Sequence, residues 1–211
     1  MNNLQKECEL IGAIIGDGYI SLAGGKYAIG FTGHPEDDVE YYKYLSSLIE
    51  NVWDKKITAK VRLRGLRMAF GSKDICLHLI NEVGLGHGEN KSISAKIPDG
   101  IFSDWSLLRF VVRGIADTDG SVFFSKKPGV EKYPAIELTT CSLTLAKQLR
   151  EALLCRGFRV TKLRSYSSKL SSNLTYKVCL YGKANLAMWV AKIGFSNPYK
   201  LARAKALLCD S

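Results

Sequence analysis

The sequence predicts an α+β fold made of two pseudo-symmetric halves, each with antiparallel strands and the element order α-β-β-α-β-β-α. Three observations support this prediction: a nine-residue pattern occurs twice, the same succession of helical and strand patterns follows each copy, and glycine-containing turns separate these patterns. The chain has 211 residues, enough for one large domain or two small ones. We place the boundary near Pro98, which gives an N-terminal repeat over residues 1–98 and a C-terminal repeat over residues 99–211.

The repeated pattern joins the end of a helix to the start of a strand. The first copy reads LIGAIIGDG over residues 10–18, and the second reads VRGIADTDG over residues 112–120. Their aspartates, Asp17 and Asp119, are 102 residues apart (119 − 17). Because the following elements recur in the same order, chance similarity of nine residues does not explain the match.

The elements after each copy follow from hydrophobic periodicity and turn residues. In the first half, we expect strands at 19–22 and 27–32, a helix at 39–52 and strands at 57–64 and 66–71. In the second half, we expect strands at 121–125 and 135–140 joined by a longer loop over 126–133, a helix at 143–156 and strands at 158–166 and 175–181. A short helix from Lys73 or Lys183 completes each half and ends near Gly84 or Gly194.

Small residues one helical turn apart mark a contact between the two repeated helices. Gly12 and Gly16 occupy these positions in the first copy, and Gly114 and Thr118 occupy them in the second. A stripe of small residues lets two helix backbones approach closely, despite the cost of about 1 kcal/mol for a helical glycine. The aspartates that follow the two helices are then expected to converge.

Two converging carboxylates favour a divalent cation between them, since they otherwise repel and raise each other's pKa. Oxygen ligands suit Mg²⁺, which takes few protein ligands and keeps several waters. A single Asp-Gly after a helix is usually only a turn, but a duplicated one at matching positions favours a catalytic pair. We therefore interpret Asp17 and Asp119 as catalytic residues.

Both nine-residue copies resemble the LAGLIDADG motif, through Leu10, Gly12, Ile14, Asp17 and Gly18 in the first copy and Gly114, Asp117, Asp119 and Gly120 in the second. The repeat covers nearly the whole chain, so the resemblance is to the monomeric, two-motif homing endonucleases. It implies paired motif helices between the halves and two or three Mg²⁺ ions, replaceable by Mn²⁺, shared between Asp17 and Asp119. It also implies weaker metal ligation by the carbonyls of Gly16 and Thr118 and a structural, hydrogen-bonding role for Asp117.

The resemblance further implies a lysine near each active site, at the end of the fourth strand. Lys73 and Lys183 fit this description and each other. A cation there would stabilise developing charge on the phosphate. The alternative interpretation is a solvated lysine near the start of a helix.

The formal net charge of +10 predicts an anionic partner, with nucleic acid favoured over acidic lipid. Cations alternate along the predicted strands, so they share one face of a sheet. The residues expected to contact DNA are Lys60, Arg62, Arg64, Arg67, Lys162, Arg164, Tyr166 and Lys177. The resemblance implies that two such sheets form a saddle over double-stranded DNA, where cations would contact phosphates and guanine edges. An evenly basic surface is the alternative.

These features together predict an intron-encoded endonuclease that makes double-strand breaks in a long, pseudo-symmetric DNA site. An RNA maturase that binds intron RNA, a DNA-binding regulator that does not cut, and a purely structural basic protein are the alternatives. The apolar runs around residues 10–15 and 107–115 are too short to span a membrane, and the N-terminus lacks a cationic, apolar signal pattern. We therefore expect an intracellular monomer without a membrane partner.

Overall fold

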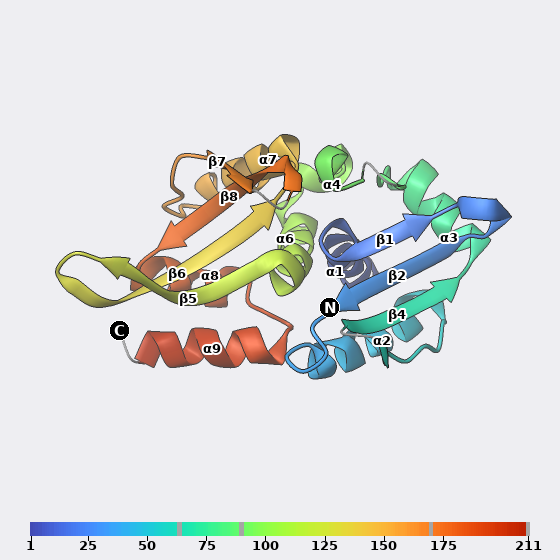
Figure 1. Cartoon of the computed structure of the whole chain (residues 1–211), viewed down its shortest axis with the longest axis horizontal. Helices are drawn as coiled ribbons and strands as arrows, with labels where there is room; N and C mark the ends of the chain where they lie inside the picture. Colours follow the sequence, from blue (N-terminus) through green and yellow to red (C-terminus); the bar gives the residue numbers. More distant parts are fainter. Residues whose placement is uncertain (63–64, 89–90, 169–170, 210–211) are drawn as a thin grey trace.

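Two four-stranded antiparallel sheets lie side by side in the computed structural model, with two long helices between them and further helices packed against one face (Figure 1). The structure describes residues 1–62, 65–88, 91–168 and 171–209. The predicted α+β fold of two similar halves is confirmed, since both sheets have the same strand order relative to their sequence. Among the described helices, none combines the length and the apolar character needed to cross a bilayer.

The N-terminal half contains a sheet of order β1-β2-β4-β3. Its elements are α1 (Asn3–Ile15), β1 (Gly18–Ser21), the 3-10 turn η1 (Ala23–Gly25), β2 (Ala28–Gly33), α2 (Val39–Trp53), β3 (Lys60–Arg62), β4 (Gly65–Gly71), α3 (Lys73–Leu77), the π-helical turn η2 (His78–Glu82) and α4 (Lys91–Ser94). Asn2 and Gln5 form a capping box that fixes the start of α1.

The C-terminal half contains the matching sheet, of order β5-β6-β8-β7. Its elements are α5 (Asp99–Phe102), α6 (Trp105–Asp119), β5 (Gly120–Lys127), β6 (Val130–Thr140), α7 (Leu143–Leu154), β7 (Arg164–Ser168), β8 (Ser171–Tyr181), α8 (Lys183–Lys192) and α9 (Pro198–Cys209). The segment before α5 is held by this half, because the main chain of Ile97 exchanges two hydrogen bonds with the Gln148 side chain on α7.

Each sheet has one buried face and one open face, as strand alternation requires. In the first sheet, Ile20, Ile29 and Met68 are buried against the helices. Tyr19 and Arg67, on the opposite face, are exposed. The open faces of both sheets are therefore available to a partner on the same side of the molecule, the side turned to the viewer in Figure 1.

Helices α1 and α6 meet backbone to backbone at Gly12 and Gly114. A Cβ atom at Gly114 would lie 2.2 Å from the carbonyl oxygen of Glu9, and one at Gly12 would lie 2.2 Å from that of Val111. Only glycine permits this separation. The predicted contact between the two motif helices is thus confirmed, and its backbone-to-backbone part lies five residues before each aspartate.

The predicted element order is found in both halves, but one loop and the bounds of two strands were wrong, and three further helices are present. Residues 126–133 do not form a loop: β5 and β6 continue through a bulge near Lys127 to a tight turn containing Gly129, whose φ is 74°. The strands expected at 57–64 and 158–166 are shorter, beginning at Lys60 and Arg164. Helices α4, α5 and α9, absent from the prediction, supplement the expected elements.

Candidate active site and nucleic-acid interface

Asp17 and Asp119 meet at the ends of the two motif helices. Asp119 is the last residue of α6, and Asp17 follows Gly16, which ends α1. A Cβ atom at Gly16 would lie 2.0 Å from Oγ1 of Thr118 and 3.2 Å from Oδ2 of Asp119, so the C-terminal ends of α1 and α6 approach closely here too. The two carboxyl groups are near enough for each to shift the pKa of the other.

Burial disfavours the charged form of both carboxyl groups. Desolvation, followed by the charge of Asp17, raises the pKa of Asp119 to about 7. Desolvation also raises the pKa of Asp17, although part of this residue remains exposed to solvent. A cation beside both carboxyl groups would offset this effect and stabilise their charged forms.

Two lysines that the sequence analysis did not single out lie beside this pair. Lys91 Nζ donates hydrogen bonds to the carbonyls of Ile14, Gly16 and Gly18, the distance to Gly16 being 3.0 Å. Lys200 Nζ donates to the carbonyls of Ala116, Asp117 and Thr118 at 3.0, 2.7 and 2.9 Å. Each ammonium thus caps the negative end of one motif helix.

The charges of both lysines also act on the carboxyl groups, lowering the pKa of Asp17 and Asp119 against desolvation. Desolvation in turn lowers the pKa of Lys91 to about 8 and lowers that of Lys200. A sequence signal for them exists, because Lys91 follows Gly84 by seven residues and Lys200 follows Gly194 by six. The two lysines are therefore pseudo-symmetric partners of the two aspartates.

The structure does not bring Lys73 and Lys183 to the carboxyl groups. Lys73 begins α3 beyond Gly71, which pairs with Ala28, whereas the strand start at Gly18 pairs with Phe31 at the other end of β2. Its Nζ lies 5.8 Å from the centre of the Tyr27 ring. Lys183 begins α8 after Gly182, whose N–H bonds to the Pro134 carbonyl, while Gly120 pairs with Leu138. Both lysines therefore lie at the far ends of their sheets.

Asp117 points away from this pair and into the core. Its side chain is 1% exposed, and Oδ2 accepts a hydrogen bond of 2.9 Å from the main-chain N–H of Ser196. Desolvation raises the pKa of Asp117 to about 7. This arrangement ties α6 to the segment before α9, as a structural role for Asp117 requires.

Asp38, just before α2, is a third acid near the first aspartate. It raises the pKa of Asp17 through its charge, after desolvation and against the opposing effect of Lys200. Its Oδ2 accepts from the His34 N–H at 2.7 Å, and its Oδ1 accepts from Asn197 Nδ2 at 3.2 Å. The two halves of the site therefore differ, because this acid stands beside Asp17.

The donor set at the seam fits a magnesium-like cation. It offers two carboxyl groups and the carbonyls of Gly16 and Thr118, each of which has a second lone pair besides the one engaged by a lysine. Among the described residues, no cluster of three or more His, Cys, Asp and Glu side chains could hold a metal by itself. Few protein ligands, all of them oxygen, are typical of Mg²⁺, whose remaining ligands are water and phosphate.

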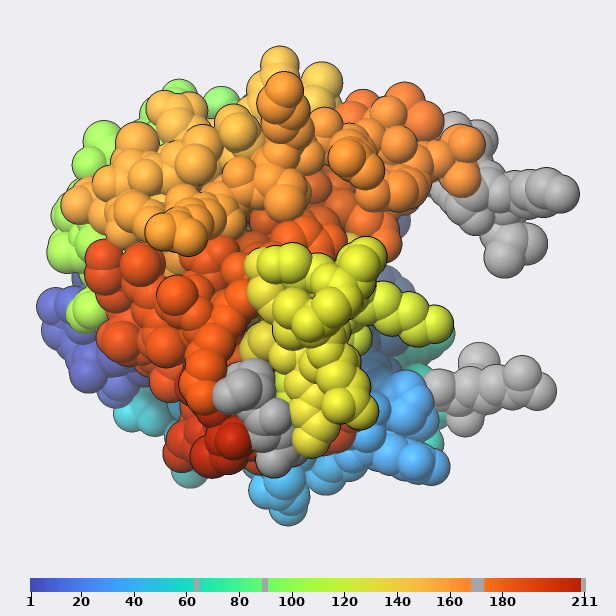
Figure 2. Space-filling view, turned by 90° about the vertical axis from the view of Figure 1, so that its left-hand side faces the viewer, coloured from blue at the N-terminus to red at the C-terminus, as the bar shows by residue number. Residues whose placement is uncertain are grey.

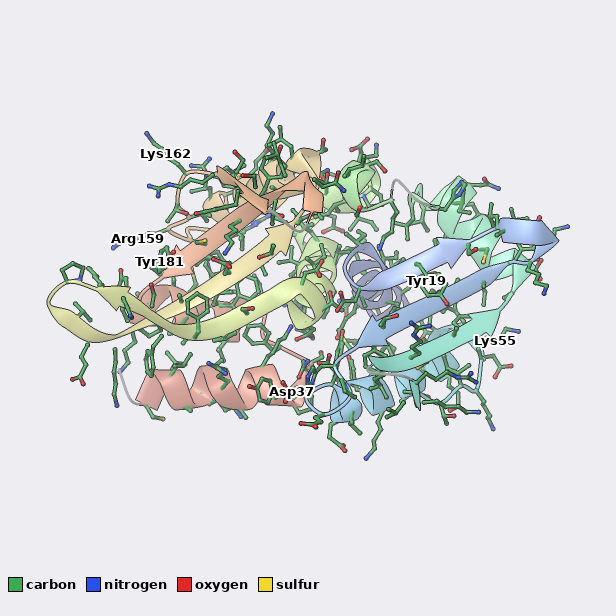
Figure 3. The ribbon with its side chains drawn as sticks, in the orientation of Figure 1. Tyr19, Asp37, Lys55, Arg159, Lys162 and Tyr181 are labelled. Carbon is green, nitrogen blue, oxygen red and sulfur yellow. The ribbon has the colours of Figure 1, made fainter. Side chains whose placement is uncertain are left out.

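Two matching recesses open on the sheets and contain most of the residues expected to contact DNA. The recess on the first sheet, of about 440 Å³, is lined in part by Tyr19 and by Lys60, Arg62 and Arg67. The recess on the second sheet, of about 400 Å³, is lined in part by Lys162, Arg164, Tyr166 and Lys177. Arg64 lies outside the described residues. Figure 3 shows Tyr19 on the first sheet and Tyr181 and Lys162 on the second.

The two recesses differ in how their cations are engaged. Lys177 Nζ lies 2.8 Å from Oε1 of Glu137 and 5.2 Å from the centre of the Tyr166 ring. Lys60 and Arg67, which pair across β3 and β4, have no carboxylate partner among the described residues. The open face is therefore cationic on the first sheet and mixed on the second.

Comparison with known proteins gives a family match and several longer relatives. Residues 106–194 match the model of the LAGLIDADG-like domain. The chain is 29% identical over 203 residues to the replication factor C small subunit of Methanocaldococcus jannaschii, covering 96% of this chain and 10% of that protein. It is 25% identical to the replicative DNA helicase DnaB of Rhodothermus marinus and 27% identical to the tRNA-splicing ligase RtcB of Methanopyrus kandleri, covering 90% and 88% of this chain. The chain spans about a tenth to a fifth of the length of these curated relatives.

Solved structures with the same fold bind DNA or carry the same domain name. The homing endonuclease I-DmoI in complex with DNA and Ca matches with a TM-score of 0.67 at 14% identity, covering 98% of both chains. The N-terminal LAGLIDADG domain of DUF199/WhiA matches with a TM-score of 0.59 at 14% identity, covering 93% of this chain and 86% of that one. The protein therefore has the LAGLIDADG fold, with a LAGLIDADG-like domain in its C-terminal half.

Proposed function

We propose that this protein is a site-specific endonuclease that makes double-strand breaks in DNA by hydrolysing phosphodiesters with a divalent metal, Mg²⁺ or Mn²⁺. One observation carries the proposal: Asp17 and Asp119, contributed by two repeats, converge where α1 and α6 end side by side, since a Cβ atom at Gly16 would lie 3.2 Å from Oδ2 of Asp119. The cationic recesses on the two neighbouring sheets would hold the DNA across this seam. The DNA and metal complexes of I-DmoI, which has the same fold, support the proposal.

Asp17 and Asp119 would hold the metal, with the carbonyls of Gly16 and Thr118 as further ligands. When bound, the divalent ion supplies the positive charge that activates water and stabilises the leaving oxygen. Lys91 and Lys200 contribute fixed positive charge beside the scissile phosphates, held in place by three carbonyl groups each. Lys91 has a pKa of about 8, so its ammonium form is populated at neutral pH.

Duplication of the site suits cleavage of both DNA strands. Each half supplies one aspartate, one capping lysine and one basic recess, arranged about the contact of α1 and α6. Both repeats lie in a single chain, so one molecule would supply both active sites, and we expect a monomer to cut. The asymmetry at Asp38 and Glu137 predicts unequal rates for the two strands.

The pattern of relatives supports a role in homing. About 200 residues of similar sequence occur in a replication factor C small subunit, a replicative DNA helicase and a tRNA-splicing ligase, whose names share no activity. A homing endonuclease cuts copies of a gene that lack the DNA element encoding the endonuclease, and repair of the break copies the element into that gene. Such spread would explain why similar sequences occur in such different proteins.

A cleavage selection tests the proposed function. The protein is incubated with a library of random-site DNA in Mg²⁺, and the cut molecules are captured and sequenced. We expect enrichment of a long, pseudo-symmetric site with both strands cut near its centre. No enrichment in Mg²⁺ or Mn²⁺ would overturn the proposal.

The second candidate is a nucleic-acid-binding protein that does not cut. The cationic recesses on the sheets would suit a DNA-binding regulator, and an intron RNA maturase is the RNA counterpart. Binding selection without metal, on DNA and on structured RNA, separates these candidates from the nuclease. Enriched ligands without cleavage in metal would support the second candidate.

A further inference from the structure

The two open sheet faces carry different chemistry at one equivalent position. The first strand pairs after each catalytic aspartate are Gly18 with Phe31 and Gly120 with Leu138. One step further, Gly30 on β2 is therefore equivalent to Glu137 on β6. In the first sheet, the ring of Tyr19 covers Gly30, because a Cβ atom there would lie 2.4 Å from a ring carbon. In the second sheet, a carboxylate takes that place.

Glu137 is firmly held on the open face. Its Oε1 lies 2.8 Å from Lys177 Nζ, and its Oε2 accepts a hydrogen bond of 3.5 Å from the Cys179 thiol. The side chain of Glu137 is 18% exposed and that of Lys177 is 33% exposed, so both remain within reach of a ligand. The pair presents a hydrogen-bond acceptor beside a hydrogen-bond donor, with Arg164 opposite Lys177 on β7.

A carboxylate on this face needs an explanation, since it repels the phosphates that the surrounding cations attract. The described strand residues on the open face of the first sheet include no acid. In the major groove, glutamate accepts a hydrogen bond from cytosine N4, and lysine donates to guanine O6 and N7. A C·G pair thus offers a donor beside acceptors, the complement of Glu137 beside Lys177.

We propose that Glu137 and Lys177 form a base-reading pair that selects a C·G base pair in the half-site under the C-terminal sheet. Glu137 accepts from cytosine N4, and Lys177 donates to the paired guanine. Because Glu137 lies one strand pair beyond Gly120, which follows Asp119, the selected base pair lies on the inner side of that half-site. This inference rests on the proposed DNA binding and adds its sequence preference.

The test compares base preferences of the wild type, Glu137→Gln and Glu131→Gln in binding and cleavage selections with a randomised C-terminal half-site. Glutamine pairs with adenine N6 and N7, so Glu137→Gln is expected to change the preference at one inner position from cytosine towards adenine. Cytosine over adenine is expected to be favoured roughly ten- to hundredfold by the wild type and not by the variant. Glu131→Gln removes the same charge from the exposed end of the same strand, and we expect its base preferences to match the wild type.

Two outcomes would overturn the inference. If Glu137→Gln bound every sequence more tightly with an unchanged base profile, Glu137 would only restrain Lys177. If the wild type enriched a site without a preference for cytosine in this half, Glu137 and Lys177 would not read bases, although the proposal of DNA binding would still hold. A wild type that enriched no DNA at all would refute the proposed function itself. Thermal melting of both glutamine variants excludes misfolding as the cause of a changed profile.

Discussion

A methyl group at Gly114 is expected to push the two motif helices apart. In Gly114→Ala, the new carbon would lie 2.2 Å from the carbonyl oxygen of Glu9 and 2.7 Å from the main-chain nitrogen of Ala13. An ordinary contact needs 3.4 Å, so the backbones must separate by roughly 1 Å. Both obstacles are main-chain atoms, which cannot rotate away as a flexible side chain would.

Two effects of this separation can be estimated. Overpacking costs about 1–3 kcal/mol, while alanine regains about 1 kcal/mol of helix propensity, so the free energy of unfolding falls by up to about 2 kcal/mol. For a protein of this size, the melting temperature then falls by at most about 4–8 °C. A shift of about 1 Å between Asp17 and Asp119 is expected to slow cleavage by about 10²-fold.

Urea unfolding and single-turnover cleavage of a cognate site measure both effects. Gly100→Ala is the matched control, because a Cβ atom there meets nothing within 4 Å and the residue lies in the short helix α5. We expect this control to cleave at the wild-type rate and to be at least as stable. If Gly114→Ala were more stable than the wild type, as expected for a glycine-to-alanine change at an exposed helix position, and if it also cut normally, the motif helices could not be in close contact at this residue.

Three further predictions follow from other contacts. Lys91→Met and Lys200→Met should each slow cleavage by about 10²-fold, and nicked DNA should accumulate in gel assays. Equal cutting of both strands at the normal rate would show that these lysines have no part in the mechanism. Burial alone would lower the pKa of His78, but hydrogen bonds to Glu82 and Glu7 raise it overall, so the stability that these contacts add is present at pH 6 and lost as pH rises through that pKa. Glu7→Gln should therefore destabilise the protein at pH 6 more than at pH 9 in thermal melts, and a constant difference would contradict this linkage. The β5–β6 hairpin reaches past the rest of its sheet in Figure 1, and it faces the viewer in Figure 2. Its first strand has eight residues, against four in β1, so hydroxyl-radical footprints should extend about four base pairs further on that side. Symmetric protection would argue against contact by the hairpin.

The motif helices and both sheets could be predicted because their signals are local and repeated. Small residues at Gly12 and Gly114 mark a close helix contact in any structure where two such helices meet. Alternation of apolar and polar residues fixes which face of each strand is buried, and so places the recess cations together. Because the pattern occurs twice, the two halves can be aligned residue by residue, which a single Asp-Gly turn would not allow.

The capping lysines could not be derived in the same way, because their contacts are not local. Lys91 reaches carbonyls more than seventy positions earlier in the chain, at Ile14, Gly16 and Gly18. Lys73 and Lys183 matched the expected description by sequence alone, but the direction of the strands carries them to the opposite sheet ends. The sequence predicts where a strand ends, but it does not predict whether that end lies near the active site or at the opposite edge of the sheet.

The extended hairpin and α9 were missed for different reasons. The residues around Gly129 are polar on both faces of a two-stranded ribbon, so they show no alternation that distinguishes strand from loop. Helix α9 has readable signals, with Pro198 in its first turn and several alanines. It lies beyond the repeated pattern that organised the prediction, and its contribution, Lys200, became evident only from the packing of the two halves.

Single-turnover cleavage by Asp17→Asn and Asp119→Asn tests the central claim most directly. Amides keep the shape of the pair but remove the charge that would hold a divalent cation. With the selected DNA site in Mg²⁺, we expect each variant to bind within a few-fold of the wild type and to lose double-strand cleavage by about 10³-fold. Cleavage of both strands at the wild-type rate by either variant would contradict the claim that these two aspartates form the active site.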